Sequence, residues 1–339
     1  MDDVICGNFF IRAEFQEGWI ERSTGIFHSG LEGKPVYTCF PEPVNAHTHL
    51  GDSFMSQEPR GTLAEVVGPR GLKARSLLER SDREIIDSII SSIRFMKEAG
   101  TSYFMDYRET GLPSKNQFQE IKNAHAGAII LARPGNISDL STLSEYVDGI
   151  GISSISDIGI EKAAELSVNT KKLGLIVSTH FSEERVEDFS SLAEFSPDLV
   201  IHGSALKEKE QFQDLSDITR NIAICPRSNR YFGIDQNYSI YGENGMNVMM
   251  GTDNAMISNP DIFQEMEFLF RIQKNVSRIE PEEILQMCTW NSLDFIFSRK
   301  KATSMNWICI ERPELSAFSI ITRYWAMKNY SLKISETIK

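Results

Sequence analysis

The sequence lacks the cysteine patterns of a disulfide framework or a structural zinc site. Its five cysteines are scattered, and no two of them form a CxxC pair. An odd number of isolated cysteines is typical of a chain kept in a reducing compartment. We therefore expect a cytoplasmic protein without disulfide bonds.

Excess basic charge and long apolar runs are also missing. Lys and Arg number 35 against 47 Asp and Glu, which gives a formal net charge of −12. Nucleic-acid binders usually concentrate Lys and Arg, and a bilayer span needs roughly 18–20 apolar residues. The start Met1-Asp-Asp also lacks the basic and apolar parts of a signal peptide. We expect a small-molecule partner, neutral or cationic rather than polyanionic, and neither nucleic acid nor membrane.

Eight short apolar runs alternate along the chain with amphipathic segments. Such runs are typical of parallel strands buried on both faces, and strands that alternate with helices predict βαβ units. Eight units predict a closed (β/α)8 barrel, an α/β fold, over residues 43–298. The runs are Pro43–His47, Ser102–Tyr107, Gly127–Ala132, Val147–Ile152, Leu175–His180, Leu199–His202, Ile222–Cys225 and Val248–Gly251.

Two helix starts have clear signals. Ser81-Asp-Arg-Glu84 is a capping-box pattern before a stripe of apolar residues, and Gly100 is the predicted stop. Asn259-Pro260 predicts a cap followed by proline at the first helical position.

Both ends of the chain contain short runs with strand-like composition. They are Asn8–Ala13 near the start, and Trp307–Ile310 and Ala317–Ile321 near the end. We expect residues 1–42 and 299–339 to pair into one small composite β-domain.

Four of the six histidines lie at the carboxyl ends of predicted strands. His47 and His49 end strand 1, His180 ends strand 5, His202 ends strand 6, and Asp253 follows strand 8. Residues i and i+2 of a strand point to one side, so both imidazoles of strand 1 can face the barrel axis. With His180 and Asp253 they form a set of three nitrogens and one oxygen that suits Zn²⁺ or Fe²⁺ and leaves a position for water.

Each of these residues has an ordinary structural explanation when taken alone. A His-x-His pair occurs by chance, and Gly251-Thr-Asp253 is a common turn sequence. Burying several imidazoles and a carboxylate around one axis without a cation would be costly, however. The joint pattern therefore favours a metal site.

The motifs and their order resemble those of the amidohydrolase superfamily. The branch that they match best contains cytosine deaminase-like, chlorohydrolase-like and adenosylhomocysteine deaminase-like enzymes. That resemblance implies a distorted TIM barrel with one metal ion per chain, and Val147–Ile152 contains no lysine that could bridge a second ion. The matching motifs are Val44-Asn-Ala-His-Thr-His-Leu50, Thr179-His-Phe-Ser-Glu183, Val200-Ile-His202, Cys225-Pro-Arg-Ser-Asn-Arg230 and Gly251-Thr-Asp-Asn254.

The resemblance also implies roles for three residues. Asp253 would ligate the metal and accept a proton from water as general base. Glu183 would carry a proton to a ring nitrogen and to the leaving group, and His202 would steady the tetrahedral centre. Apart from the resemblance, Glu183 could equally be a solvated residue at a helix start.

Candidate substrate-binding residues follow strands 2 and 7. Arg108 ends strand 2, and Arg227, Asn229 and Arg230 follow strand 7. Arginine suits carboxylate, phosphate or a nucleobase edge, but each of these arginines could instead form a surface ion pair. Residues 51–80 are rich in glycine, proline and charge and are a candidate lid.

The leading hypothesis is hydrolytic deamination of an aminated heterocycle that resembles a nucleobase, a nucleoside or a pterin. The alternatives are a cyclic amidase or chlorohydrolase on the same metal, and a catalytically inactive binding protein. The sequence does not choose between Zn²⁺ and Fe²⁺, and a homodimer is expected only because it is common among such enzymes.

Overall fold

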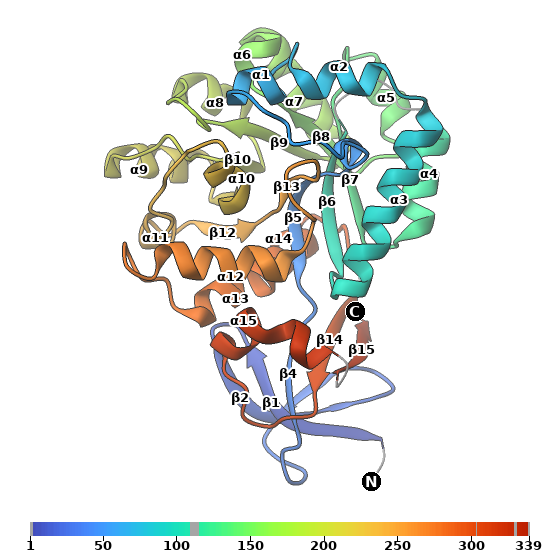
Figure 1. Cartoon of the computed structure of the whole chain (residues 1–339), viewed down its shortest axis with the longest axis vertical. Helices are drawn as coiled ribbons and strands as arrows, with labels where there is room; N and C mark the ends of the chain where they lie inside the picture. Colours follow the sequence, from blue (N-terminus) through green and yellow to red (C-terminus); the bar gives the residue numbers. More distant parts are fainter. Residues whose placement is uncertain (1–2, 109–114, 303, 329–330, 338–339) are drawn as a thin grey trace.

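The computed structural model describes residues 3–108, 115–302, 304–328 and 331–337, which are organised around two sheets (Figure 1). A nine-stranded sheet and its helices form the upper part of that view. A six-stranded sheet made from both ends of the chain forms the lower part. Among the described residues, no helix has the length and apolar character that a membrane crossing requires.

All eight predicted runs form parallel strands, which confirms a distorted (β/α)8 barrel. The two-residue strand β13 follows the eighth strand and pairs with the first, so the sheet closes on itself. The Asn45 amide joins this seam: Nδ2 donates to Thr252 Oγ1 at 2.8 Å and Oδ1 accepts from Thr252 N at 3.1 Å. The strands are β5 (Val44–His49), β6 (Tyr103–Arg108), β7 (Ala128–Ala132), β8 (Gly149–Ile152), β9 (Ile176–Phe181), β10 (Leu199–His202), β11 (Asn221–Ile224), β12 (Asn247–Met250) and β13 (Asp253–Asn254).

Side chains alternate between the two faces of the barrel strands. Phe104 and Ile130 pack with Ile89 and Ile93 of helix α3, outside the sheet. Their neighbour Met105 belongs to a separate apolar cluster that includes residues of several other strands. Both faces are therefore buried, which explains why these strands are continuous apolar runs.

The helices follow the strands and cover the outside of the barrel. At the start of α3, Ser81 and Glu84 form the predicted capping box, and Gly100 ends the helix with a φ of 97°. The helices are η1 (Leu50–Asp52), α1 (Leu63–Val67), α2 (Leu72–Leu78), α3 (Asp82–Ala99), α4 (Lys115–Ala124), α5 (Asp139–Leu143), α6 (Ile155–Ile158), α7 (Ile160–Lys172), α8 (Phe189–Phe195), α9 (Lys209–Ile218), α10 (Pro226–Tyr231), α11 (Ser239–Glu243), α12 (Ile262–Gln273), α13 (Pro281–Cys288) and α14 (Trp290–Ser298).

The predicted start of α12 is wrong by two residues. The cap is Asp261, whose carboxylate accepts from the backbone N–H groups of Phe263 and Gln264. Asn259 and Pro260 lie before the helix. A carboxylate at the N-cap binds the same orphan N–H groups that an asparagine would, so local sequence did not distinguish the two positions.

The terminal segments form one mixed sheet with the strand order β15-β14-β4-β1-β2-β3. The sequence predicted a strand at Ala317–Ile321, and this prediction is wrong. The segment is the first part of helix α15 (Ala317–Met327). Ala317, Ile320, Ile321 and Tyr324 have helical spacing and are buried on one face. The strands are β1 (Val4–Ile11), β2 (Glu14–Glu21), β3 (Phe27–Ser29), β4 (Tyr37–Pro41), β14 (Ser304–Ile310) and β15 (Ser331–Thr337). The division at residues 42/43 and 298/299 stays a prediction.

Candidate active site

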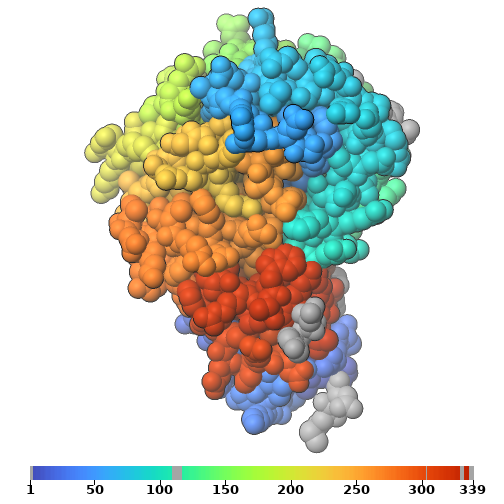
Figure 2. Space-filling model, in the orientation of Figure 1, coloured from blue at the N-terminus to red at the C-terminus, as the bar shows by residue number. Residues whose placement is uncertain are grey.

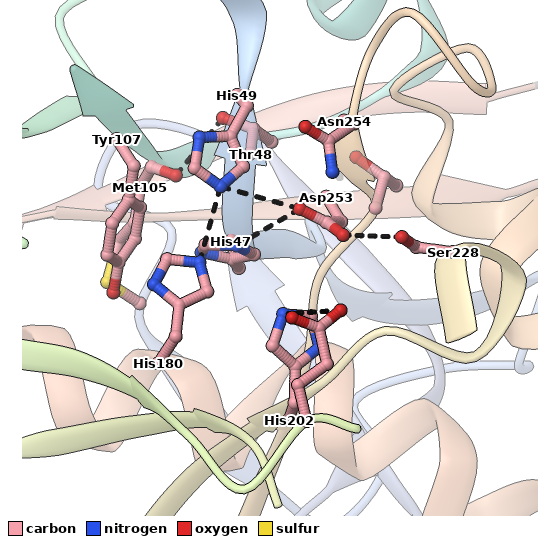
Figure 3. Close-up of polar contacts among 12 residues, drawn as sticks. His47, Thr48, His49, Met105, Tyr107, His180, His202, Ser228, Asp253 and Asn254 are labelled. Carbon is pink, nitrogen blue, oxygen red and sulfur yellow. Dashed lines mark hydrogen bonds and ion pairs between the residues drawn. The ribbon is translucent and has the colours of Figure 1, made fainter. Parts of the chain in front are cut away.

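The first barrel strand supplies two imidazoles. His47 and His49 are two residues apart on β5, and their side chains converge with those of His180 and Asp253 (Figure 3). The backbone beyond His49 turns at once into η1, where Leu50 N donates to Asp106 Oδ1 at 2.8 Å. Asp106, on the adjacent strand, thereby holds the turn that follows His49.

Distances between donor atoms test whether the four residues fit a metal ion. Asp253 Oδ1 lies 3.3 Å from His47 Nε2 and 3.4 Å from His49 Nε2. Nε2 of His49 lies 3.3 Å from Nε2 of His180. Bonds of about 2.0–2.1 Å in a tetrahedral site give ligand separations of about 3.3–3.4 Å. These three separations therefore match those expected around a divalent cation such as Zn²⁺.

The protonation of the imidazoles agrees with this fit. Burial lowers the pKa of His47 to about 3 and holds the pKa of His180 well below its usual value. Nδ1 of His180 lies 3.0 Å from the carbonyl oxygen of Ile152, which orients Nε2 toward the cluster. At neutral pH the rings of His47 and His180 are uncharged and their lone pairs can bind a cation.

Asp253 is the carboxylate of the cluster. Burial alone would raise its pKa, but the hydrogen bond with His47 and the nearby imidazoles outweigh burial and hold the pKa well below its ordinary value. Ser228 Oγ donates to Asp253 Oδ2 at 2.5 Å, on the side away from His47 (Figure 3). The backbone of Asp253 has a φ of 58°, a left-handed conformation that is costly for a residue other than glycine.

Glu183 and His202 lie beside the ligand cluster. Glu183 Oε1 is 3.5 Å from His202 Nε2, and ligand atoms of both residues and Asp253 lie within 4.8 Å of one another. Burial and the charge of Asp253 raise the pKa of Glu183 to about 8, whereas burial lowers the pKa of His202 to about 4. A protonated carboxyl group thus faces an uncharged imidazole.

These residues open into a cavity of about 540 Å³ at the carboxyl ends of the strands. Its wall includes Leu63, Val67, Lys73 and Leu77 from α1 and α2, within the segment predicted as a lid. That segment forms a blue layer across the top of the barrel (Figure 2). The cavity is therefore covered on one side by residues 63–78.

Two of the predicted substrate-binding arginines point elsewhere. Arg227 donates through N to Glu265 Oε1 at 2.7 Å, and its guanidinium also pairs with the buried Glu265. Arg230 is exposed and pairs with Asp235. Neither lines the cavity, because α10 begins directly after β11 and carries both side chains away from it.

Asn229 also lies outside the cavity wall. It is buried and donates through Nδ2 to Ser204 Oγ at 2.6 Å and to the Tyr238 hydroxyl at 2.9 Å. Against the larger lowering by burial, Asn229 also raises the pKa of His202. Its position suits the support of His202 rather than contact with substrate. Of the four predicted substrate-binding residues, Arg108 alone lines the cavity.

Sequence reasoning missed several residues at the site. Lys73 reaches from α2 and donates to Asn254 Oδ1 at 2.7 Å. The Tyr107 ring packs on His47 with centroids 4.3 Å apart. Ser228 and Arg133 were also missed. Ser228 stands inside a motif that was recognised, but nothing local to Lys73 indicates a position beside strand 8.

Comparisons with known proteins show which family the sequence matches. A sequence model described as "Amidohydrolase family" matches residues 39–297. A protein of Archaeoglobus fulgidus provisionally named an aminohydrolase is 29% identical over 268 residues, which is 75% of this chain and 78% of that protein.

Two solved structures share the fold at low sequence identity. Guanine deaminase from C. acetobutylicum with bound guanine is 14% identical with a TM-score of 0.75, over 99% of this chain and 100% of that chain. Atrazine chlorohydrolase from Arthrobacter aurescens complexed with zinc is 14% identical with a TM-score of 0.71, over 94% and 91%. At this level of identity the likeness concerns the fold alone.

Proposed function

This chain belongs to the amidohydrolase family, and on that basis we propose that it is a metal-dependent hydrolytic deaminase of an aminated heterocycle. The observation that carries the proposal is the position of Glu183. Its carboxyl group lies on the cavity, 3.5 Å from His202, and burial and the charge of Asp253 raise its pKa to about 8. Deamination needs such a proton donor, because both the ring nitrogen and the departing nitrogen gain a proton.

His47, His49, His180 and Asp253 would hold the cation. When bound, a divalent cation supplies Lewis acidity that lowers the pKa of a water molecule toward about 7. The choice between Zn²⁺ and Fe²⁺ stays open, since both accept three nitrogens and one oxygen.

The protein side chains would then move the protons. Asp253, ionised at neutral pH, accepts a proton from the attacking water. Glu183 donates its proton to the ring nitrogen and then carries the proton of the new hydroxyl group to the amino group, which leaves as ammonia while the carbonyl forms. The proton held by Asp253 returns to Glu183 and restores both carboxyl groups. The uncharged His202 donates or accepts a hydrogen bond at the attacked carbon's new oxygen, according to its tautomer. Tyr107 and residues 63–78 shield these steps from bulk water.

A second function uses the same cluster without a proton donor of this kind. Chlorohydrolysis of a ring expels chloride, which needs no proton. The fold shared with a chlorohydrolase supports this alternative. Hydrolysis of a cyclic amide is the related third case.

The test is a panel of substrates with zinc-loaded and iron-loaded protein. Ammonia release from aminated purines, pyrimidines and pterins is measured beside chloride release from chlorotriazines and ring opening of cyclic amides. We expect ammonia release alone. Chloride release or ring opening without ammonia would reject the deaminase, and no turnover on any class would favour a binding protein. The cytoplasmic location and the homodimer stay predictions.

A further inference from the structure

Arg108 has a guanidinium group whose hydrogen-bonding capacity is only partly used by the residues that the structure describes. It lines the cavity and is 5% exposed. Its contacts are long: Nη1 lies 3.5 Å from Asp106 Oδ2, and Nη2 donates to Gln117 Oε1 at 3.3 Å. Within the part of the chain that the structure describes, Nε is buried and has no hydrogen-bond partner. Buried guanidinium groups are normally well hydrogen-bonded, so this one is suited to bind a further acceptor.

A glycine makes room for this guanidinium beside the ligand cluster. A Cβ atom on Gly51 would lie 2.6 Å from Arg108 Nη1. Gly51 belongs to η1, the turn that directly follows His49. The close approach therefore places the arginine against the same turn that positions a predicted metal ligand.

A second arginine stands next to Arg108. Arg133 N donates to Arg108 O at 2.9 Å, so the two residues lie at the ends of neighbouring strands β6 and β7. Arg133 also lines the cavity, with Nη2 3.5 Å from Asp157 Oδ2 and the side chain 27% exposed. Lys73 adds a third cation from the covering segment.

The carboxylates on the same wall do not cancel this arrangement. Asp157 faces Arg133 at a distance longer than a good hydrogen bond, and Glu184 is exposed. Glu183 lies 3.5 Å from His202, and Asp253 belongs to the ligand cluster. Asp106 and Asp52 pair with Arg108 and Lys73 at 3.5 and 3.6 Å, but neither carboxylate lines the cavity. The side of the cavity formed by β6 and β7 therefore presents the two guanidinium groups to a ligand.

We propose that the substrate carries an acidic group, a carboxylate or a phosphate, that binds Arg108 and Arg133 while the ring faces the ligand cluster. This inference rests on the proposed function, because it adds a substituent to the heterocycle. It also revises the expectation of a neutral or cationic substrate. The net charge of −12 lies mostly on the surface, where salt screens it within about 10 Å, whereas the arginines contact the ligand directly.

The experiment compares two probes of one shape, benzoate and benzamide. Their binding to metal-loaded protein is measured by calorimetry at constant ionic strength. Benzoate should bind at least about tenfold more tightly, because hydrogen bonds between ionised partners are the strong ones. Phenyl phosphate forms a third arm: tighter binding than benzoate assigns the site to phosphate, and weaker binding assigns it to carboxylate.

Variants show where the probe binds. Arg108→Gln and Arg133→Gln should each remove most of the preference for benzoate, and Arg108→Lys should restore part of it. The matched control is Arg230→Gln, an exposed arginine outside the cavity, which should keep the preference. Arg133 is partly exposed, so its variant stays informative if loss of Arg108 unfolds the barrel. Metal content and melting temperature report that folding.

The binding readout separates this inference from the proposed function. Equal affinity for both probes, or a benzoate preference that survives both arginine substitutions, would overturn the acidic-group site; the latter result would place the carboxylate on the metal. Arginine-dependent benzoate binding without ammonia release from any aminated heterocycle, including those that carry a carboxylate or phosphate, would support the site and reject the deaminase.

Discussion

Replacing Glu183 with glutamine tests the proposed chemistry most directly. Glutamine keeps the size and shape of the side chain but cannot donate a carboxyl proton. At pH 7 a glutamate with an ordinary pKa of 4.5 would be about 0.3% protonated, whereas a pKa of about 8 gives about 90%. Before a cation binds, the site thus raises the population of the acid form by roughly 300-fold. We expect turnover of Glu183→Gln to fall by about 10²–10⁴, the usual contribution of a positioned general acid.

The same variant should leave the metal site intact. The close donor contacts join His47, His49, His180 and Asp253 and do not include Glu183. Metal content by mass spectrometry of the protein digest should therefore be unchanged, and KM should change less than kcat. Glu194→Gln, on the exposed face of α8, is the matched control and should retain the normal rate.

The pH profile adds an independent readout. The protonated form of Glu183 is lost as pH rises through its pKa, so kcat/KM should decline at or below about pH 8, since a bound cation favours the ionised form. Glu183→Gln should lose that decline. A variant with a near-normal rate and an unchanged profile would refute the role of Glu183, and the chlorohydrolase or cyclic amidase would then become the better proposal.

Three further predictions concern the metal and the charges around it. Purified protein should hold close to one equivalent of Zn or Fe, and His180→Ala should lose the metal while circular dichroism stays native; two tightly bound ions per chain would contradict the single site. Arg227→Ala should lower the free energy of unfolding, measured with denaturant, by about 3–5 kcal/mol, because it leaves Glu265 buried and unpaired. KM should change little, and a raised KM would indicate that Arg227 contacts the substrate. Metal-free protein should lose stability as pH falls below about 6.5. The histidines of the unfolded chain bind protons there, whereas the buried imidazoles of the folded protein, whose pKa values are lowered, do not. A pH titration of the melting temperature that stays flat between pH 7 and 5 would contradict this.

Much of the architecture followed from local sequence. The barrel strands are continuous apolar runs because both of their faces are buried, so eight of them could be recognised without a structure. The capping box at Ser81 and the stop at Gly100 depend on residues within one helical turn. His47 and His49 share a direction because strand geometry alternates every residue, and that rule is local too.

Other features depended on which segments meet in space. The strand-like composition of Ala317–Ile321 did not decide its conformation; burial of one face of α15 did. Arg227 looked like a substrate ligand until Glu265, 38 residues further along the chain, was found beside it. The motif Cys225–Arg230 was predicted to contribute to the site, but Ser228 rather than an arginine contacts Asp253.

The class of fold and the candidate ligands could be predicted because periodicity and strand ends are properties of neighbouring residues. The charge of the cavity wall depends on how distant segments pack. Lys73 from α2, Arg108 from β6 and Arg133 after β7 are brought to one wall by the closure of the barrel and by the segment that covers it. Charge at a binding site depends on distances across the fold, and the spacing of residues along a chain does not contain those distances.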